Sequence, residues 1–137
     1  MNQMTRKALT IAAAILLVLS FSQSSFARGW VYLGEAHVDG QADHDKIKIG
    51  KSEGRFRALQ LKVDFVAIEF RHVVVHYSNG TSEEVQVRQR IRAGGSTRDI
   101  DLAGRDRAID SVEIWYERGN YGRRQRPRVR LFGFETR

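Results

Sequence analysis

The sequence predicts an all-β fold, an antiparallel β-sandwich or jelly roll of about eight to nine strands that follows an N-terminal signal helix. After residue 27, no stretch repeats apolar residues at a sustained helical spacing. Apolar and polar residues instead alternate in short runs, which recur every ten residues or so between Gly, Asn and Asp turn signals. The single proline, Pro127, stands before the last expected strand, where its missing N–H costs least.

The first element is an export signal over residues 1–27. Two basic residues and no acid precede an uncharged apolar stretch at 8–19. A helix of that length rises about 18 Å, short of the hydrocarbon core of about 30 Å. Ser25 and Ala27 supply the small residues of a cleavage site. We expect cleavage before Arg28, no permanent membrane span and a periplasmic or secreted mature chain; an uncleaved membrane anchor is the alternative.

The mature chain, residues 28–137, is expected to be a single domain with one core. Without cysteine, its stability must come from packing and backbone pairing. Residues 28–87 carry eight Lys or Arg against nine acids, whereas residues 88–137 carry 13 Arg against seven acids. Because arginine binds carboxylate and phosphate in bidentate fashion, this excess suggests an anionic partner. Internal ion pairs on a solvated surface are the alternative.

Nine segments fit the strand pattern. They are residues 30–33, 46–49, 55–63, 66–71, 73–77, 83–91, 98–102, 111–117 and 128–134. The clearest hairpin turns at an Asn-Gly pair. A two-residue loop would set Val75 opposite Glu84, whereas a three-residue loop over 79–81, with Gly80 at positive φ, pairs Val75 with Val85. The second register keeps apolar residues on one face and is the one predicted.

The strand after this hairpin turns three arginines outward. Val87 and Ile91 point to the core, so the opposite face carries Arg88, Arg90 and Arg92, spaced about 6.7 Å apart. These three are the candidate anion-binding residues. They are suited to an anionic glycan or to lipopolysaccharide phosphate.

A second set of candidate contacts lies in residues 118–126, where Gly, Arg and an aromatic residue are mixed. The candidates are Tyr121, Arg123, Arg124 and Arg126. Some RNA-binding tails share this composition. Export argues against a nucleic acid partner, and a flexible loop before the last strand is the preferred interpretation.

Pairing between the strands at 111–117 and 128–134 would give some of the excess arginines a structural role. If they pair as antiparallel neighbours, a ladder forms from Glu113, Trp115, Glu117, Arg128 and Arg130. Cross-strand charge pairs and a guanidinium over an indole would stabilise it.

Metal and catalytic signals are weak. Asp39, Asp43 and Asp45 place three carboxylates within seven residues, a weak calcium candidate that lacks the ligand spacing of an EF-hand. A solvated turn is favoured there. No nucleophile elbow of the form G-x-S-x-G occurs. We expect no cofactor and favour a protein that is not an enzyme.

Several fragments carry a family resemblance. They are WVYLG at 30–34, DKI at 45–47, GRFRAL at 54–59, GGSTRDIDLAG at 94–104, RAI at 107–109 and LFG at 131–133. The ordered set resembles a family of small exported bacterial β-sandwich proteins known only as a domain of unknown function. More remotely, the strand and turn pattern is similar to galactose-binding-like jelly rolls, many of which bind sugars or surfaces. The resemblance implies a fold and transfers no activity, cofactor or functional residue.

These observations favour a non-enzymatic binding module for an anionic envelope component or an envelope protein. A hydrolase acting on cell-wall or glycan substrates is the alternative. A concave site with converging carboxylates would favour the hydrolase, whereas a shallow, polar arginine face would favour binding.

Overall fold

The computed structural model describes residues 29–136 except 41, 51–52, 120 and 122–124. The expected signal segment 1–27 and the candidates Arg123 and Arg124 lie outside the described residues. Within the described ranges, no helix is long and apolar enough to cross a lipid bilayer.

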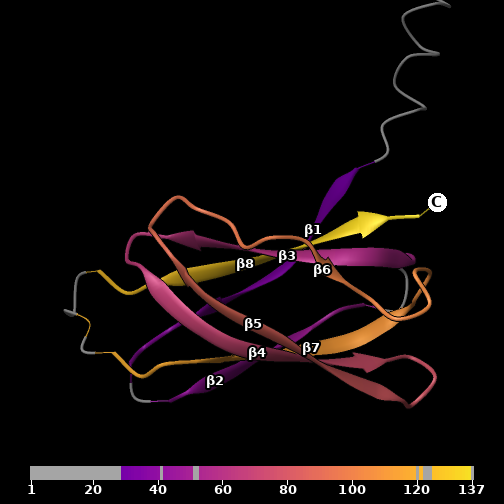
Figure 1. Ribbon diagram of the computed structural model, residues 1–137, viewed down its shortest axis with the longest axis horizontal. Helices are drawn as coiled ribbons and strands as arrows, with labels where there is room; N and C mark the ends of the chain where they lie inside the picture. Colours follow the sequence, from indigo (N-terminus) through magenta and orange to yellow (C-terminus); the bar gives the residue numbers. More distant parts are fainter. Residues whose placement is uncertain (1–28, 41, 51–52, 120, 122–124, 137) are drawn as a thin grey trace, which may run out of the picture.

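The described chain is built from β-strands (Figure 1), which confirms the all-β prediction. The strands are β1 (Trp30–His37), β2 (His44–Lys48), β3 (Phe56–Asp64), β4 (Ile68–Tyr77), β5 (Ser82–Ile91), β6 (Ile100–Asp101), β7 (Ile109–Tyr116) and β8 (Arg128–Glu135). The two expected strands at 66–71 and 73–77 are one strand, β4, which is irregular between Phe70 and His72.

The strands form two four-stranded sheets, in which all pairs are antiparallel. Sheet A has the order β1-β8-β3-β6, and sheet B has the order β2-β7-β4-β5. The pairs are nested from the ends of the chain: β1 with β8, β2 with β7, β3 with β6 and β4 with β5. This nesting is that of a jelly roll, in which one long hairpin is folded over into two layers.

The core lies between the two sheets, where the inward residues of each strand are buried. Its largest fully buried side chains are those of Tyr116, Phe56 and Phe70. Gly133 on β8 faces this core. A Cβ at that position would lie 2.6 Å from Cδ1 of Phe56 and 2.8 Å from Cδ1 of Leu33. Glycine therefore makes room for the Phe56 ring, and the rings on either side of Gly133 in β8 point to the outer face.

The hairpin between β4 and β5 has the predicted three-residue loop and the predicted positive φ at Gly80, 88°. The predicted register is wrong, because the loop covers residues 78–80 and Val75 lies opposite Glu83. The Glu83 carboxylate accepts a hydrogen bond from the Tyr77 hydroxyl. The Glu83 carboxylate therefore has a hydrogen-bond partner on the inward face of this edge strand. The prediction assumes that only apolar residues face inward there.

The predicted ladder between β7 and β8 is wrong. In the nested order, β7 lies between β2 and β4 in sheet B, and β8 lies between β1 and β3 in sheet A. Arg128 and Arg130 therefore lie in a different sheet from Glu113 and Trp115, although the two strands follow one another in the chain; Glu117 comes directly after β7.

Candidate functional site

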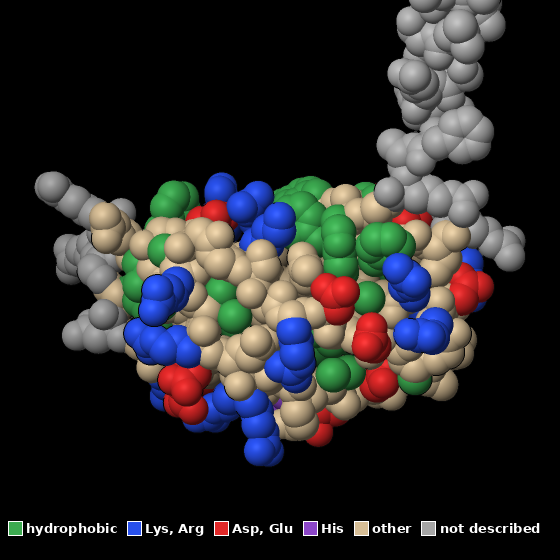
Figure 2. All heavy atoms as spheres, turned by 45° about the horizontal axis from the view of Figure 1, so that its top comes forward, with side chains coloured by type: hydrophobic (Ala, Val, Ile, Leu, Met, Phe, Trp, Pro, Cys, Tyr) green, Lys and Arg blue, Asp and Glu red, His purple; other side chains and the backbone are tan. Residues whose placement is uncertain are grey.

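The outer face of sheet A carries four aromatic side chains on β1 and β8. The register sets Trp30 opposite Phe134 and Tyr32 opposite Phe132. In both pairs the rings meet edge to face, with centroids 5.3 and 5.8 Å apart. Trp30 is 37% exposed and Tyr32 is 47% exposed. In the view that turns sheet A forward, Figure 2 shows hydrophobic side chains gathered along the upper side of the molecule. We call these four residues the aromatic face.

Two cationic side chains of β3 lie over the rings of this face. The Arg57 guanidinium carbon is 4.2 Å from the Phe134 centroid, and Lys62 Nζ is 4.8 Å from the Phe132 centroid. Both distances fall within the range of cation–π attraction. Among the described residues, no carboxylate forms an ion pair with Arg57 or Lys62. The rings hold the two charges in place without neutralising them.

The two arginines of β8 are held by one carboxylate instead. Asp64, whose side chain is 16% exposed, accepts hydrogen bonds from Arg128 Nε at 2.9 Å, Arg130 Nε at 2.7 Å and Arg130 Nη2 at 3.0 Å. The hydrogen bond from Arg130 and then that from Arg128 hold the pKa of Asp64 below its usual value, although burial acts in the opposite direction. We call this group the Asp64 cluster.

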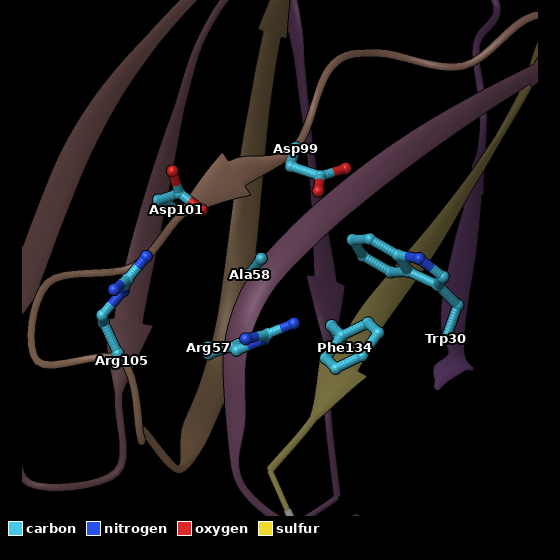
Figure 3. A pocket seen from close by; sticks show the side chains of 7 residues that line it. All are labelled: Trp30, Arg57, Ala58, Asp99, Asp101, Arg105 and Phe134. Atoms are coloured by element: carbon cyan, nitrogen blue, oxygen red, sulfur yellow. The ribbon is translucent and has the colours of Figure 1, made fainter. Parts of the chain in front are cut away.

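A hollow of about 220 Å³ lies where the aromatic face meets β6 (Figure 3). Its lining consists of Trp30, Arg57, Ala58, Asp99, Asp101, Arg105 and Phe134. Figure 3 shows the indole, the Phe134 ring and the Arg57 guanidinium on one side, with the two carboxylates on the other and Arg105 reaching toward Asp101. Asp99 accepts a hydrogen bond from Gln60 Nε2 at 2.9 Å. We call this hollow the aromatic pocket; it combines ring surface with hydrogen-bond donors and acceptors.

The outer face of sheet B also carries an indole, in a different setting. Trp115 stacks between His44 and His72, with centroids 4.2 and 5.4 Å away and interplanar angles of 15° and 21°. The three histidines of this face each meet a carboxylate, in the pairs His44–Asp43 at 3.0 Å, His72–Glu84 at 3.2 Å and His76–Glu113 at 2.7 Å. Arg71 is likewise paired with Glu117 at 2.8 Å. The side chains around this indole therefore have carboxylate partners, whereas among the described residues no ion pair is formed by Lys46 or Lys48, which face outward on β2.

The three arginines predicted as an anion stripe are exposed on β5 and just beyond its end. A bulge interrupts their alignment, since Arg88 has a φ of 46° and the register shifts there. Arg88 lines a hollow with Arg71, whereas Arg90 lines a different one with Tyr121. The structure therefore brings Arg90 together with a predicted loop contact, while a continuous stripe of three is not formed.

The remaining predicted residues are spread over one end of the molecule. Tyr121 is half-buried against the core, and Arg126 is exposed. The three aspartates of the calcium candidate each have a hydrogen-bond partner in the protein. Asp39 Oδ1 accepts from the Ala42 N–H at 3.4 Å, Asp43 bonds His44 at 3.0 Å and Asp45 accepts from the Tyr116 hydroxyl at 2.6 Å. In the described part of the chain, no group of three or more His, Asp or Glu could hold a metal ion.

The aromatic face was missed at the level of the sequence. Its signal was present, because Trp30 and Tyr32 alternate on one strand and Phe132 and Phe134 alternate on another. What the sequence does not show is that these two strands, from opposite ends of the domain, are neighbours. The pairing of β1 with β8 is what turns two alternating patterns into one surface.

The sequence profile of one family, described as Domain of unknown function (DUF2541), matches residues 10–133. The chain belongs to this family. The match confirms the resemblance to a domain of unknown function over nearly all of the DUF2541 chain. No curated protein matches it.

Among solved structures, the DUF2541 chain is similar to one described as "Structural and functional characterization of Pseudomonas aeruginosa AlgX". The TM-score is 0.47 at 13% sequence identity, covering 74% of this chain and 25% of the other. The DUF2541 chain thus corresponds to a quarter of the other chain, and a likeness at this level carries no functional argument. The case for function rests on the side chains of the site.

Proposed function

We propose that this chain is an exported, non-enzymatic binding module that takes an acidic polysaccharide on the outer face of sheet A. The observation that carries the proposal is the aromatic face itself. Four aromatic side chains lie on one open sheet surface, with the charges of Arg57 and Lys62 held over two of them and not paired with a carboxylate of the described residues.

The chemistry of this surface fits that of an acidic sugar. The C–H faces of a sugar ring are apolar and pack on aromatic rings, while its hydroxyls need hydrogen-bond partners. In the aromatic pocket, Trp30 and Phe134 supply ring surface, and Asp99 and Asp101 supply acceptors. Arg57 offers the planar donor pair that binds a carboxylate or phosphate group.

The extent of the surface fits a polymer. Outward side chains run along β8 from Phe134 to Arg128, a rise of about 20 Å for six residues of strand. The four aromatic side chains lie on an open sheet surface beside the aromatic pocket, whereas a small-molecule site is concave and encloses most of its ligand. Several weak contacts spread along the strand suit an extended chain.

Export is a separate part of the proposal and rests on the pattern of residues 1–27. Microsequencing of the protein recovered from outside the cytoplasm tests it. A chain that starts at Arg28 would support cleavage, and one that starts at Met1 would contradict it.

The two carboxylates of the aromatic pocket bring a hydrolase into consideration. In glycoside hydrolases, two carboxyl groups flank the scissile bond from either side. Here Asp99 and Asp101 belong to one short segment, on one side of the pocket (Figure 3). We therefore assign them the role of hydrogen-bond acceptors. Release of new reducing ends from a bound polysaccharide, abolished by Asp99→Asn or Asp101→Asn with binding retained, would favour the hydrolase.

The binding test uses acidic polysaccharides that each have a neutral parent: polygalacturonate with its methyl ester, dextran sulfate with dextran, and phosphomannan with mannan. We expect binding to at least one acidic polymer and none to its parent. Trp30→Ala and Arg57→Gln should each weaken that binding at least tenfold.

A matched pair of lysines supplies the control. Lys62→Gln removes a charge from the aromatic face, and Lys46→Gln removes one from the outer face of sheet B. We expect a severalfold loss from the first and no change from the second. Binding to none of the three acidic polymers, or equal effects of the two lysine variants, would overturn the proposal.

A further inference from the structure

Phe65 is the most exposed large apolar side chain of the described residues, at 62%. It lies in the turn between β3 and β4, at the left-hand end of Figure 1, where β3 ends. The aromatic pocket lies toward the other end of sheet A, where β8 ends. Phe65 is not among the side chains assigned to the polysaccharide, and the two surfaces meet at Arg128.

The backbone at Phe65 is strained. Its φ is 78°, and the N–H of Val66 donates to the carbonyl oxygen of Asp64 at 3.0 Å. This is a γ-turn with a positive φ at its centre, the rare form that bulky side chains adopt at a cost and glycine adopts freely. A large apolar side chain thus occupies a position where glycine would fit better, and most of its surface faces water. Stability alone explains neither feature, and retained strain of this kind is typical of functional positions.

Arginines surround this turn. The Arg128 guanidinium carbon is 5.2 Å from the Phe65 centroid. The backbone of Val63 is hydrogen-bonded in both directions to the 94–95 turn, at 2.7 and 3.0 Å, which places the exposed Arg92 nearby. On the other side, Val66 shares a hollow of about 290 Å³ with Arg90 and Arg118. Figure 2 shows several Lys and Arg side chains at this end of the molecule, with acidic side chains among them.

The nearby acids are mostly neutralised. Asp64 is bound by Arg128 and Arg130, and Glu117 is paired with Arg71. Glu69 also lines the hollow. The end of the molecule therefore presents one protruding aromatic ring within a surface of excess positive charge. We call it the Phe65 end.

We propose that the Phe65 end docks on an anionic phospholipid surface, with the Phe65 ring inserted among the headgroups. Its phosphates would be bound by Arg90, Arg92 and Arg118, which form no ion pair among the described residues, and not by Arg128, which Asp64 holds. Aromatic side chains concentrate at the membrane–water interface, and basic side chains are drawn to anionic lipid. A stable protein interface needs a broad, complementary apolar area, which one isolated ring does not supply. A bilayer interface requires no complementary shape, so a single ring with flanking charges suits it better.

Flotation of the exported protein with vesicles tests this proposal. We expect binding to vesicles of equal parts phosphatidylglycerol and phosphatidylcholine at low salt, and at least tenfold weaker binding to pure phosphatidylcholine. Phe65→Gly should weaken binding to the anionic vesicles at least fivefold. Because glycine relieves the positive φ, the same variant should unfold at the same or a higher temperature, which separates loss of docking from loss of folding.

A control variant removes an exposed aromatic elsewhere. Tyr32→Ser takes a ring from the aromatic face and should leave vesicle binding unchanged, while Phe65→Trp should retain it. No binding to anionic vesicles, equal binding to both vesicle types, or full binding by Phe65→Gly would overturn the proposal. The proposal would also be overturned if the parent protein did not bind vesicles but bound a soluble protein, and if Phe65→Gly abolished that binding. None of these results bears on polysaccharide binding, which the Trp30 and Arg57 variants test.

Discussion

The outer faces of the two sheets carry similar residues in different settings. Sheet A exposes Trp30 at its edge and holds the charge of Arg57 over a ring, with no carboxylate partner among the described residues. Sheet B stacks Trp115 between two histidines that each also meet a carboxylate. An aromatic ring packed against a nitrogen-bearing side chain is therefore no indication of binding by itself. What distinguishes the two settings is whether the group that lies on the ring also has a carboxylate partner within the fold.

The Asp64 cluster shows that the distinction can fall within a single sheet. Arg128 and Arg130 lie on the same outer face as Arg57, yet one carboxylate holds both of them. A ligand gains less from these two arginines, because it would have to compete with Asp64. The comparison can be tested by replacing, in turn, side chains that are held within the fold and side chains that are exposed.

The largest effect is expected from Trp115→Ala. The indole is half-buried and stacked on two rings, so its removal should lower the free energy of unfolding by about 3 kcal/mol. Urea denaturation measures this loss. The matched variant Trp30→Ala should cost about 1 kcal/mol, since Trp30 is more exposed. Equal losses in the two variants would show that the indoles do not differ in role.

An intermediate effect is expected from Asp64→Asn, which removes the carboxylate that holds two arginines. At neutral pH the variant should be less stable by about 1–2 kcal/mol, because the arginines are about one-third exposed and the pair is partly screened. The folded state lowers the pKa of Asp64, so this stabilisation is present above the unfolded value of about 3.9 and is lost as pH falls through the folded pKa.

The pH dependence supplies the check on this prediction. Unfolding free energies of the parent and Asp64→Asn, measured from pH 7 downward, should converge below about pH 4. If the difference in unfolding free energy between the two proteins stayed constant across the acid range, the charge of the Asp64 carboxylate would not be what stabilises the cluster.

The smallest effect on the fold is expected from replacing Arg88, Arg90 and Arg92 together with Ser. All three are exposed, so the free energy of unfolding should change by less than about 0.5 kcal/mol per residue. Polysaccharide binding should fall less than in Arg57→Gln, because these arginines lie on, or just beyond, the edge strand of the other sheet. A triple variant that failed to fold would show that the arginines are structural.

The fold was predictable because alternation reports directly which side of a strand is buried. The segment at 128–134 shows this best: Val129 and Leu131 are fully buried, as the pattern requires. Pairing was harder to predict. The ladder between Trp115 and the arginines assumed that strands adjacent in the sequence are adjacent in space, whereas the jelly roll places β7 and β8 in opposite sheets.

The candidate site depended on which strands are neighbours, which the sequence alone does not show. Arg88, Arg90 and Arg92 were identified because one strand suffices to see them, and their outward direction agrees with the structure. The aromatic face needs two strands from opposite ends of the domain. Phe65 gave no sequence signal either, because its importance comes from a positive φ and high exposure.

The most direct test of the account locates bound polysaccharide on the two faces. The backbone amide signals of the nitrogen-15-labelled exported protein are followed by NMR as polygalacturonate is added, with its methyl ester as the uncharged control; if another acidic polymer of the panel binds more tightly, that polymer and its parent replace them. The account predicts shifts concentrated on β1, β3 and β8, including Trp30, Arg57 and Phe134, and none with the neutral polymer. Shifts concentrated around Trp115 on sheet B, or equal shifts with the charged and neutral polymers, would contradict it.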